Sequence, residues 1–95
     1  MSRLVQRSAT GVAVARNANA PAIVVYSITL TAAAAAATVT IDDSAGGAGT
    51  DLISLAAPIG GSVQWHAGDV SGVIFLANVH ATLAGAGALL TLETN

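Results

Sequence analysis

The sequence predicts an all-β fold, either an antiparallel β-sandwich or a jelly-roll-like small barrel, with six to seven short strands. Three observations carry this prediction: apolar and polar residues alternate in several short runs, Gly-rich turns separate these runs at roughly ten-residue spacing, and no run has a helical period of useful length. The chain has 95 residues and no Cys, so it forms one domain without disulfides. A domain of this size is only marginally stable alone, which favours self-association or docking on a larger body.

The clearest strand is predicted over residues 23–31, where polarity alternates with a period of two. Val24, Tyr26, Ile28 and Leu30 are expected on one face, and Ser27, Thr29 and Thr31 on the other. Shorter strands are predicted over 38–41, 52–56, 62–66, 72–76, 78–83 and 89–94. In the strand over 62–66, Val63 and Trp65 share a face, so Trp65 is expected either to pack in the core or to anchor a protein interface. In the strand over 78–83, Val79, Ala81 and Leu83 are expected inside, and Asn78, His80 and Thr82 outside.

Three connections require separate interpretation. The run Ala32–Ala37 is too short for an isolated helix, so it is interpreted as a turn followed by the start of a strand. The segment from Asp42 to Thr50 is rich in turn-forming Asp and Gly. The segment from Gly85 to Gly87 is interpreted as a tight turn that makes residues 89–94 the hairpin partner of the preceding strand.

The division of the chain follows its charges. Residues 1–20 are expected to form an extended N-terminal arm or a leading strand over 10–16, and residues 21–95 the sandwich. The three cations, Arg3, Arg7 and Arg16, all precede residue 42, whereas the five acidic residues all follow residue 41. A basic N-terminal segment could pair with an acidic neighbour, or its arginines could simply be solvated. The net charge of −2 and the absence of Lys argue against nucleic acid as a partner.

The overall composition indicates a neutral surface. Charged residues make up 8% of the chain, whereas they make up about a quarter of a typical soluble domain. Ala, Gly, Ser and Thr must therefore cover much of the exterior. The uncharged stretch between Arg16 and Asp42 is long enough to cross a bilayer. Its alternating Ser and Thr and its weakly hydrophobic Ala run argue against a span, so no membrane partner is expected.

The titratable residues give no indication of catalysis or of a bound cofactor. His66 and His80 lie on separate predicted strands, and the sequence contains no Gly-x-Ser-x-Gly motif, so the protein is predicted not to be an enzyme. Asp42, Asp43 and Asp51 flank a Gly-rich loop that lacks the regular ligand spacing of a calcium loop. They are interpreted as a solvated turn, and no metal or other cofactor is expected.

Four stretches resemble a widespread kind of small structural protein in the virions of tailed phages. The similar stretches are Val25–Ala32, Ala37–Asp43, Gly49–Ala56 and Val79–Ala88, and the resemblance extends over about residues 22–94. In that family a strand leads through a small-residue turn to a Thr-Val-Thr strand, and then through an acidic Gly-Thr hairpin to a Leu-rich strand. The similar proteins are capsid decoration or cement proteins, and some resemble head-fibre bases.

The resemblance implies a β-sandwich or jelly-roll-like module, often a homotrimer, on the outside of the capsid. Its implied partners are the major capsid protein and further copies of itself, and its implied task is to stabilise contacts between capsid subunits. No family motif assigns the contact residues. From the sequence we therefore take Arg3, Arg7, Arg16 and Trp65 as candidates for capsid or inter-subunit contact. A head-fibre base, a head–tail component and a non-viral ligand-binding β-sandwich are the alternative functions.

Overall fold

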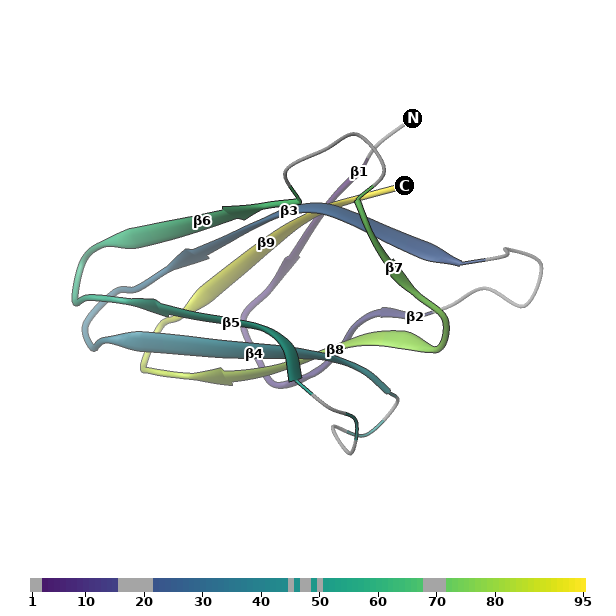
Figure 1. Ribbon diagram of the computed structural model, residues 1–95. Helices are drawn as coiled ribbons and strands as arrows, with labels where there is room; N and C mark the ends of the chain where they lie inside the picture. Colours follow the sequence, from purple (N-terminus) through teal and green to yellow (C-terminus); the bar gives the residue numbers. More distant parts are fainter. Residues whose placement is uncertain (1–2, 16–21, 45, 47–48, 50, 68–71) are drawn as a thin grey trace.

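A computed structural model describes residues 3–15, 22–44, 46, 49, 51–67 and 72–95. Over these residues the chain forms two antiparallel sheets that face each other across one core (Figure 1). One sheet has five strands, in the order β1-β9-β3-β6, with β7 pairing with β3 beyond the end of β6. The other has four, in the order β2-β8-β4-β5. The strands are β1 (Arg3–Arg7), β2 (Gly11–Ala15), β3 (Ile23–Thr31), β4 (Ala37–Asp43), β5 (Asp51–Ala57), β6 (Ser62–His66), β7 (Val73–Phe75), β8 (Asn78–Ala84) and β9 (Leu89–Thr94).

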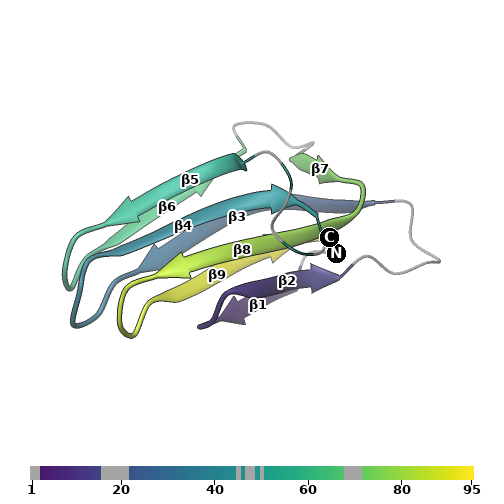
Figure 2. The ribbon, with the colours of Figure 1, turned by 90° about the horizontal axis from the view of Figure 1, so that it is seen from below.

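The strand order is that of a jelly roll. The consecutive pairs β1/β2, β3/β4, β5/β6 and β8/β9 each divide between the two sheets. Figure 2 shows the members of each pair stacked face to face, so the two sheets mirror each other strand by strand. Two sheets connected in this way define the jelly-roll architecture, and the predicted all-β class is confirmed.

The N-terminal region is more ordered than the predicted extended arm. Residues 3–15 form β1 and β2, which pair with β9 and β8 at the same side of the sandwich. The leading strand predicted over 10–16 corresponds to β2, whereas β1 was missed because arginines flank its short Leu4-Val5-Gln6 alternation. Val5 packs against the core. The predicted boundary between residues 20 and 21 lies outside the described residues.

The core is filled by aliphatic side chains and one Phe. Its fully buried large residues are Val25, Ile28, Leu30, Val39, Ile41, Phe75, Val79, Leu90 and Leu92. The predicted inward face of β3 is wrong in its first half, because the pairing with β9 shifts register between Val25 and Ser27. This bulge turns Val25 inward and leaves Val24 and Tyr26 half-buried.

Four connections between described strands cross from one sheet to the other at one end of the sandwich, at residues 8–10, 32–36, 58–61 and 85–88, and we call the last three the arches (Figure 2). The first arch contains most of the Ala run, which forms a turn as predicted, with Ala37 opening β4. The first two arches bond to each other: Ala32 N–H donates to Gly61 O (2.8 Å) and Gly60 N–H donates to Ala33 O (3.1 Å).

The third arch corrects the predicted hairpin. β9 pairs with β1 and β3, and not with β8, because the chain crosses to the opposite sheet between Gly85 and Ala88. This crossing brings Gly85 against the first arch: a Cβ added there would lie 2.5 Å from Ala36 O and 2.9 Å from Ala37 Cα. Gly85 also has a φ of 110°, which other residues rarely adopt.

The two ends of the described chain meet at the other end of the sandwich. Arg3 of β1 lies directly opposite Thr94 of β9. Asn95 then bonds to the start of β3: its Oδ1 accepts from Val24 N–H (2.9 Å), and its own N–H donates to Val24 O (3.1 Å). Its side-chain amide donates to Ala22 O (3.3 Å).

We predict that Gly85→Ala lowers the free energy of unfolding by about 2–4 kcal/mol, because it combines an unfavourable φ with a clash against backbone atoms. Chemical denaturation measures the change. Gly60→Ala is the matched control, since Gly60 also has a positive φ (71°) but a Cβ there would meet nothing within 4 Å. The control should cost only about 1–2 kcal/mol. Equal losses in the two variants would show that the close approach at Gly85 is unimportant.

Candidate functional surface

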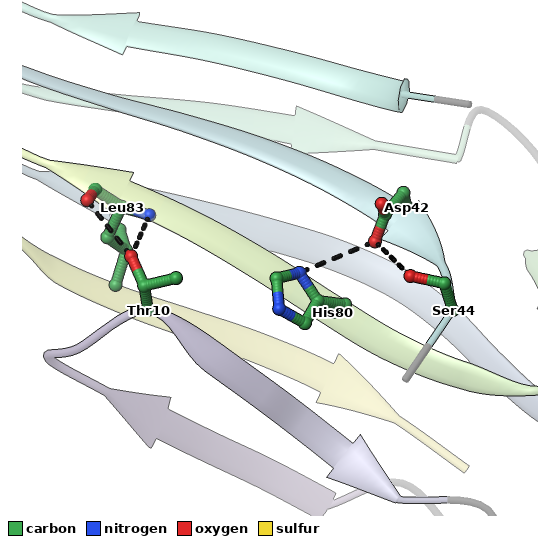
Figure 3. Close-up of polar contacts among 5 residues, drawn as sticks. All are labelled: Thr10, Asp42, Ser44, His80 and Leu83. Atoms are coloured by element: carbon green, nitrogen blue, oxygen red, sulfur yellow. Dashed lines mark hydrogen bonds and ion pairs between the residues drawn. The ribbon is translucent and has the colours of Figure 1, made fainter. Parts of the chain in front are cut away.

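A small polar cluster lies where β4 meets β8 (Figure 3). One carboxylate oxygen, Asp42 Oδ1, accepts a hydrogen bond from Ser44 Oγ (3.2 Å) and lies 3.5 Å from His80 Nδ1. The Asp and the His occupy opposite positions in the β4–β8 register, and both are buried. In a catalytic triad the His lies between the Ser and the Asp. Here the Asp lies between the other two, so these three residues are not arranged as a triad.

His80 corrects the prediction that it would be exposed. Its neighbours across the sheet are Asp42 on β4 and Val12 on β2. On the β4–β5 connection, a Cβ added to Gly49 would lie only 3.6 Å from Asp42 Cβ. The outward face is therefore occupied at this end of the four-stranded sheet. Among the described residues, His80 Nδ1 is a buried polar atom without a hydrogen bond.

The three aspartates of the predicted solvated turn occupy different environments. Asp42 is only 3% exposed, which contradicts that interpretation for this residue. Asp43 is half-buried, and its two carboxylate oxygens accept from Leu76 N–H (2.9 Å) and Ala77 N–H (2.7 Å), so it fixes the turn between β7 and β8. Asp51 is exposed at the start of β5. Asp42 and Asp43 thus have separate local roles, and Asp51 lies opposite Asp42 in the β4–β5 register.

The candidate contact residues lie on opposite sides of the molecule. Arg3 and Arg7 are the first and last residues of β1, and Arg16 lies outside the described residues. Arg7 is exposed, and its Nη1 donates to Gln6 O (2.9 Å). Trp65 lies on β6, at the other edge of the same sheet, where it is half-buried and packs against the core. Trp65 therefore packs against the core in part, and within one molecule Arg7 does not approach it.

The outer faces of both sheets carry mostly uncharged polar side chains and Ala, together with the half-buried Glu93 of β9, whose Oε1 accepts a hydrogen bond from Ser27 Oγ (3.3 Å). On the five-stranded sheet, cross-strand rows place Gln6 beside Thr91, Thr91 beside Thr29, and Thr29 beside Gln64. The corresponding outward residues of the four-stranded sheet are Thr38, Thr40, Ser54, Ala56, Thr82 and Ala84. Arg7 and Asp51 are the only ionised residues among the exposed positions that the structure describes. The predicted neutral surface is confirmed for this part of the chain.

Concave and metal-binding features give no competing candidate. No pocket is present in the structure over the described residues. In the same part of the chain, no three His, Asp or Glu side chains gather where they could hold a metal ion. No helix among the residues with a described placement is long and apolar enough to cross a membrane. The surface itself is therefore the candidate functional feature.

Comparison with known proteins identifies solved structures that have a similar fold. No protein-family model matches the sequence, and no curated protein matches it. The structure is similar to a subunit described under "Bacillus endospore appendages form a novel family of disulfide-linked pili", with 18% identity, a TM-score of 0.53, and coverage of 98% of this chain and 83% of that one. It is also similar to PirA, with 12% identity, a TM-score of 0.55, and coverage of 99% and 93%.

A third similar structure, the coat protein of Tobacco streak virus, has 10% identity and a TM-score of 0.48, with coverage of 99% of this chain and 85% of that one. At these identities the first two similar structures show a shared fold and nothing more specific. The protein is thus defined as a jelly-roll β-sandwich.

We predict that Asp42 and His80 are energetically coupled. In a double-mutant cycle with Asp42→Ala and His80→Ala, chemical denaturation should give a coupling energy of about 0.5–2 kcal/mol, because each variant leaves the other partner buried without its contact. Thr82→Ala is the control, since removing an exposed hydroxyl on the same strand as His80 should change stability by less than about 0.5 kcal/mol. A coupling energy near zero would mean that the two side chains are close without interacting.

Proposed function

We propose that this protein is a structural subunit of a protein assembly, and specifically a decoration (cement) protein on the outside of a tailed-phage capsid. Its partners would be the major capsid protein and further copies of itself, as a homotrimer. The observation that carries the proposal is the almost uncharged exterior: of the exposed residues with a described placement, only Arg7 and Asp51 are ionised.

Such an exterior is suited to permanent contact with protein. Burying a charge requires removing its hydration, and this cost often exceeds what the new contact returns. Burying Ala or Gly costs almost no side-chain entropy, whereas Lys or Arg loses roughly 1.5–2 kcal/mol. The Thr, Ser and Ala faces described above can therefore be covered at low cost. A protein that stays alone in solution ordinarily keeps a more highly charged surface.

The fold is consistent with this role. Jelly rolls recur in viral capsids and in lectins, so the architecture has precedents both in shells and in ligand-binding modules. One of the similar structures is named as a pilus protein, which is also an assembled subunit. The sequence resemblance to phage virion proteins is what directs the proposal to a capsid.

The ligand-binding alternative is weaker because of where the aromatic side chains lie. Binding of a sugar typically uses an exposed ring as a platform. Phe75 is fully buried, and Tyr26 and Trp65 are half-buried. A head-fibre base or head–tail component would share the neutral exterior and differs from a decoration protein chiefly in copy number.

We predict that purified particles contain this protein in hundreds of copies, as the many equivalent positions of a shell would require. Quantitative mass spectrometry against the major capsid protein gives the ratio. A handful of copies per particle would instead place the protein at a vertex, a fibre or the tail. Its absence from particles would contradict the virion role and favour the ligand-binding module.

We also predict that one outer face of the sandwich makes the capsid contact. Thr29→Lys introduces a charge on the five-stranded face, and Thr82→Lys on the four-stranded face. One of the two should weaken binding to undecorated capsids at least about tenfold, because the ammonium must be desolvated. The unaffected variant serves as the matched control, and co-sedimentation measures binding. If both variants bind like the wild type, neither face is the contact surface.

A further inference from the structure

The two edges of the five-stranded sheet offer a way for copies of this protein to join. Backbone hydrogen bonds at the two ends of the β3–β6 pair establish which groups face the edge formed by β6. Ala67 N–H donates to Tyr26 O (3.0 Å), and Ala32 N–H donates to Gly61 O (2.8 Å), one at each end of the β3–β6 pair. Bonded positions alternate along an antiparallel pair, so Trp65 and Val63 bond to β3. The N–H and C=O groups that face away from β3 belong to Ser62, Gln64 and His66.

The same alternation, continued across the sheet, gives the outward groups of β1. Ile28 and Leu30 of β3 bond to β6, so Ser27 and Thr29 bond to β9 on the other side. Their partners on β9 are Glu93 and Thr91, so Leu92 and Leu90 of β9 bond to β1. The N–H and C=O groups of Leu4 and Gln6 therefore face the open edge. The contact from Arg7 Nη1 to Gln6 O agrees with this, since that carbonyl lies where the exposed guanidinium can reach it.

These two edges are complementary to each other. β1 and β6 each have five residues, and they run in opposite directions across the sheet. The two strands also lie at the same height in the sheet. The row of cross-strand neighbours that starts at Gln6 ends at Gln64, and the row that starts at Leu4 ends at His66. A second copy placed beside the first therefore brings outward-facing groups together in antiparallel register, with Gln6 opposite Gln64 of that copy.

The side chains and charges also favour this pairing. On the inner face of the extended sheet, Val5 would cover the half-buried Trp65 of the second copy, and Arg7 would lie diagonal to that indole, within reach of a cation–π contact. Residues 3–15 carry two Arg and no acidic residue, whereas residues 51–67 on the opposite side carry one Asp and no Lys or Arg. The two sides that would meet are thus opposite in charge.

The four-stranded sheet is a poorer candidate for the same contact. Its β2 edge is interrupted by a register shift between Val12 and Val14, and such bulges obstruct the pairing of one edge with another. β6, in contrast, contains neither Pro nor an ionised Lys, Arg, Asp or Glu, which are the usual means of protecting an open edge.

We propose that copies of this protein associate by adding β1 of one copy to the β6 edge of the next, with Gln6 opposite Gln64 and Leu4 opposite His66. The contact uses different surfaces on the two copies, so it generates a ring if the rotation closes and an open filament if it does not. The inference depends on the fold alone, and it can fail while the proposed capsid role holds.

The first test is Gln64→Pro, measured by sedimentation velocity on the isolated protein over a range of concentrations. Proline removes the outward N–H of Gln64 and obstructs the edge, while the bonds from Val63 and Trp65 to β3 remain. The wild type should associate with rising concentration, and the variant should associate at least about tenfold more weakly. Gln64→Ala keeps the N–H and should associate like the wild type. A wild type that stays at 9.2 kDa, or equal association of both variants, would overturn the proposal.

A second test does not depend on how well the Pro variant folds. The chain has no Cys, so the double variant Gln6→Cys/Gln64→Cys has a single pair of thiols. Within one molecule these positions lie three strand spacings apart, about 14 Å, which is too far for a disulfide. Between copies in the proposed register they face each other at roughly 5.5 Å. Mild oxidation should therefore give a ladder of covalent oligomers on a non-reducing gel.

The matched control is Gln6→Cys/Ser62→Cys, in which the second thiol is displaced by two residues along β6. This diagonal distance is roughly 7–8 Å, beyond the reach of a disulfide without backbone movement. It should give little ladder. An equally strong ladder in both variants, or none in the first, would show that the copies do not pair in this register.

Discussion

The close approach of backbones at the arches is the constraint on which the rest of the structure depends. Every chain crossing at residues 32–36, 58–61 and 85–88 joins one sheet to the other, and these crossings bond and pack directly against one another. Small residues permit this at the points of contact: the first and third segments consist entirely of Ala and Gly, and the second ends in Gly60 and Gly61. The arches fix that β3 faces β4, β5 faces β6 and β8 faces β9, and the strand pairings within each sheet then give its order. The order in turn places β1 and β6 at opposite edges and leaves the Thr and Ser faces outward.

Much of the fold could be predicted from local pattern. The alternation in residues 23–31 and in the shorter runs identified strands because the period of two is a property of each segment alone. The sequence did not reveal where two segments pair. The hairpin predicted after Gly85 was wrong because a Gly-rich turn has the same composition whether it reverses the chain within one sheet or crosses to the other. β1 was missed because its apolar content is two residues, and its pairing with β9 supplies the rest of its stabilisation.

For the candidate surface, too, some features could be predicted from the sequence and others depended on how distant segments pair. Composition alone predicted a neutral exterior, because so few charged residues cannot cover a domain. The burial of His80 could not be predicted, since it depends on Asp42 across the strand pair and on a turn that approaches the outer face. Likewise, nothing in the sequence indicated that β1 and β6 lie at opposite edges of one sheet, with Val5 level with Trp65 and Arg7 two residues further along its strand. That relation follows only from the register of four strands, and it is what places Arg7 and Trp65 on the two sides of the proposed contact between copies.

The meeting of Arg3 and Thr94 has a consequence for engineering. Because the two ends of the described chain lie side by side, a short linker could connect them. A peptide fused at either end would also emerge from the same place, at the end of the sandwich remote from the arches. The domain is therefore a suitable scaffold for circular permutation and for the display of fused peptides.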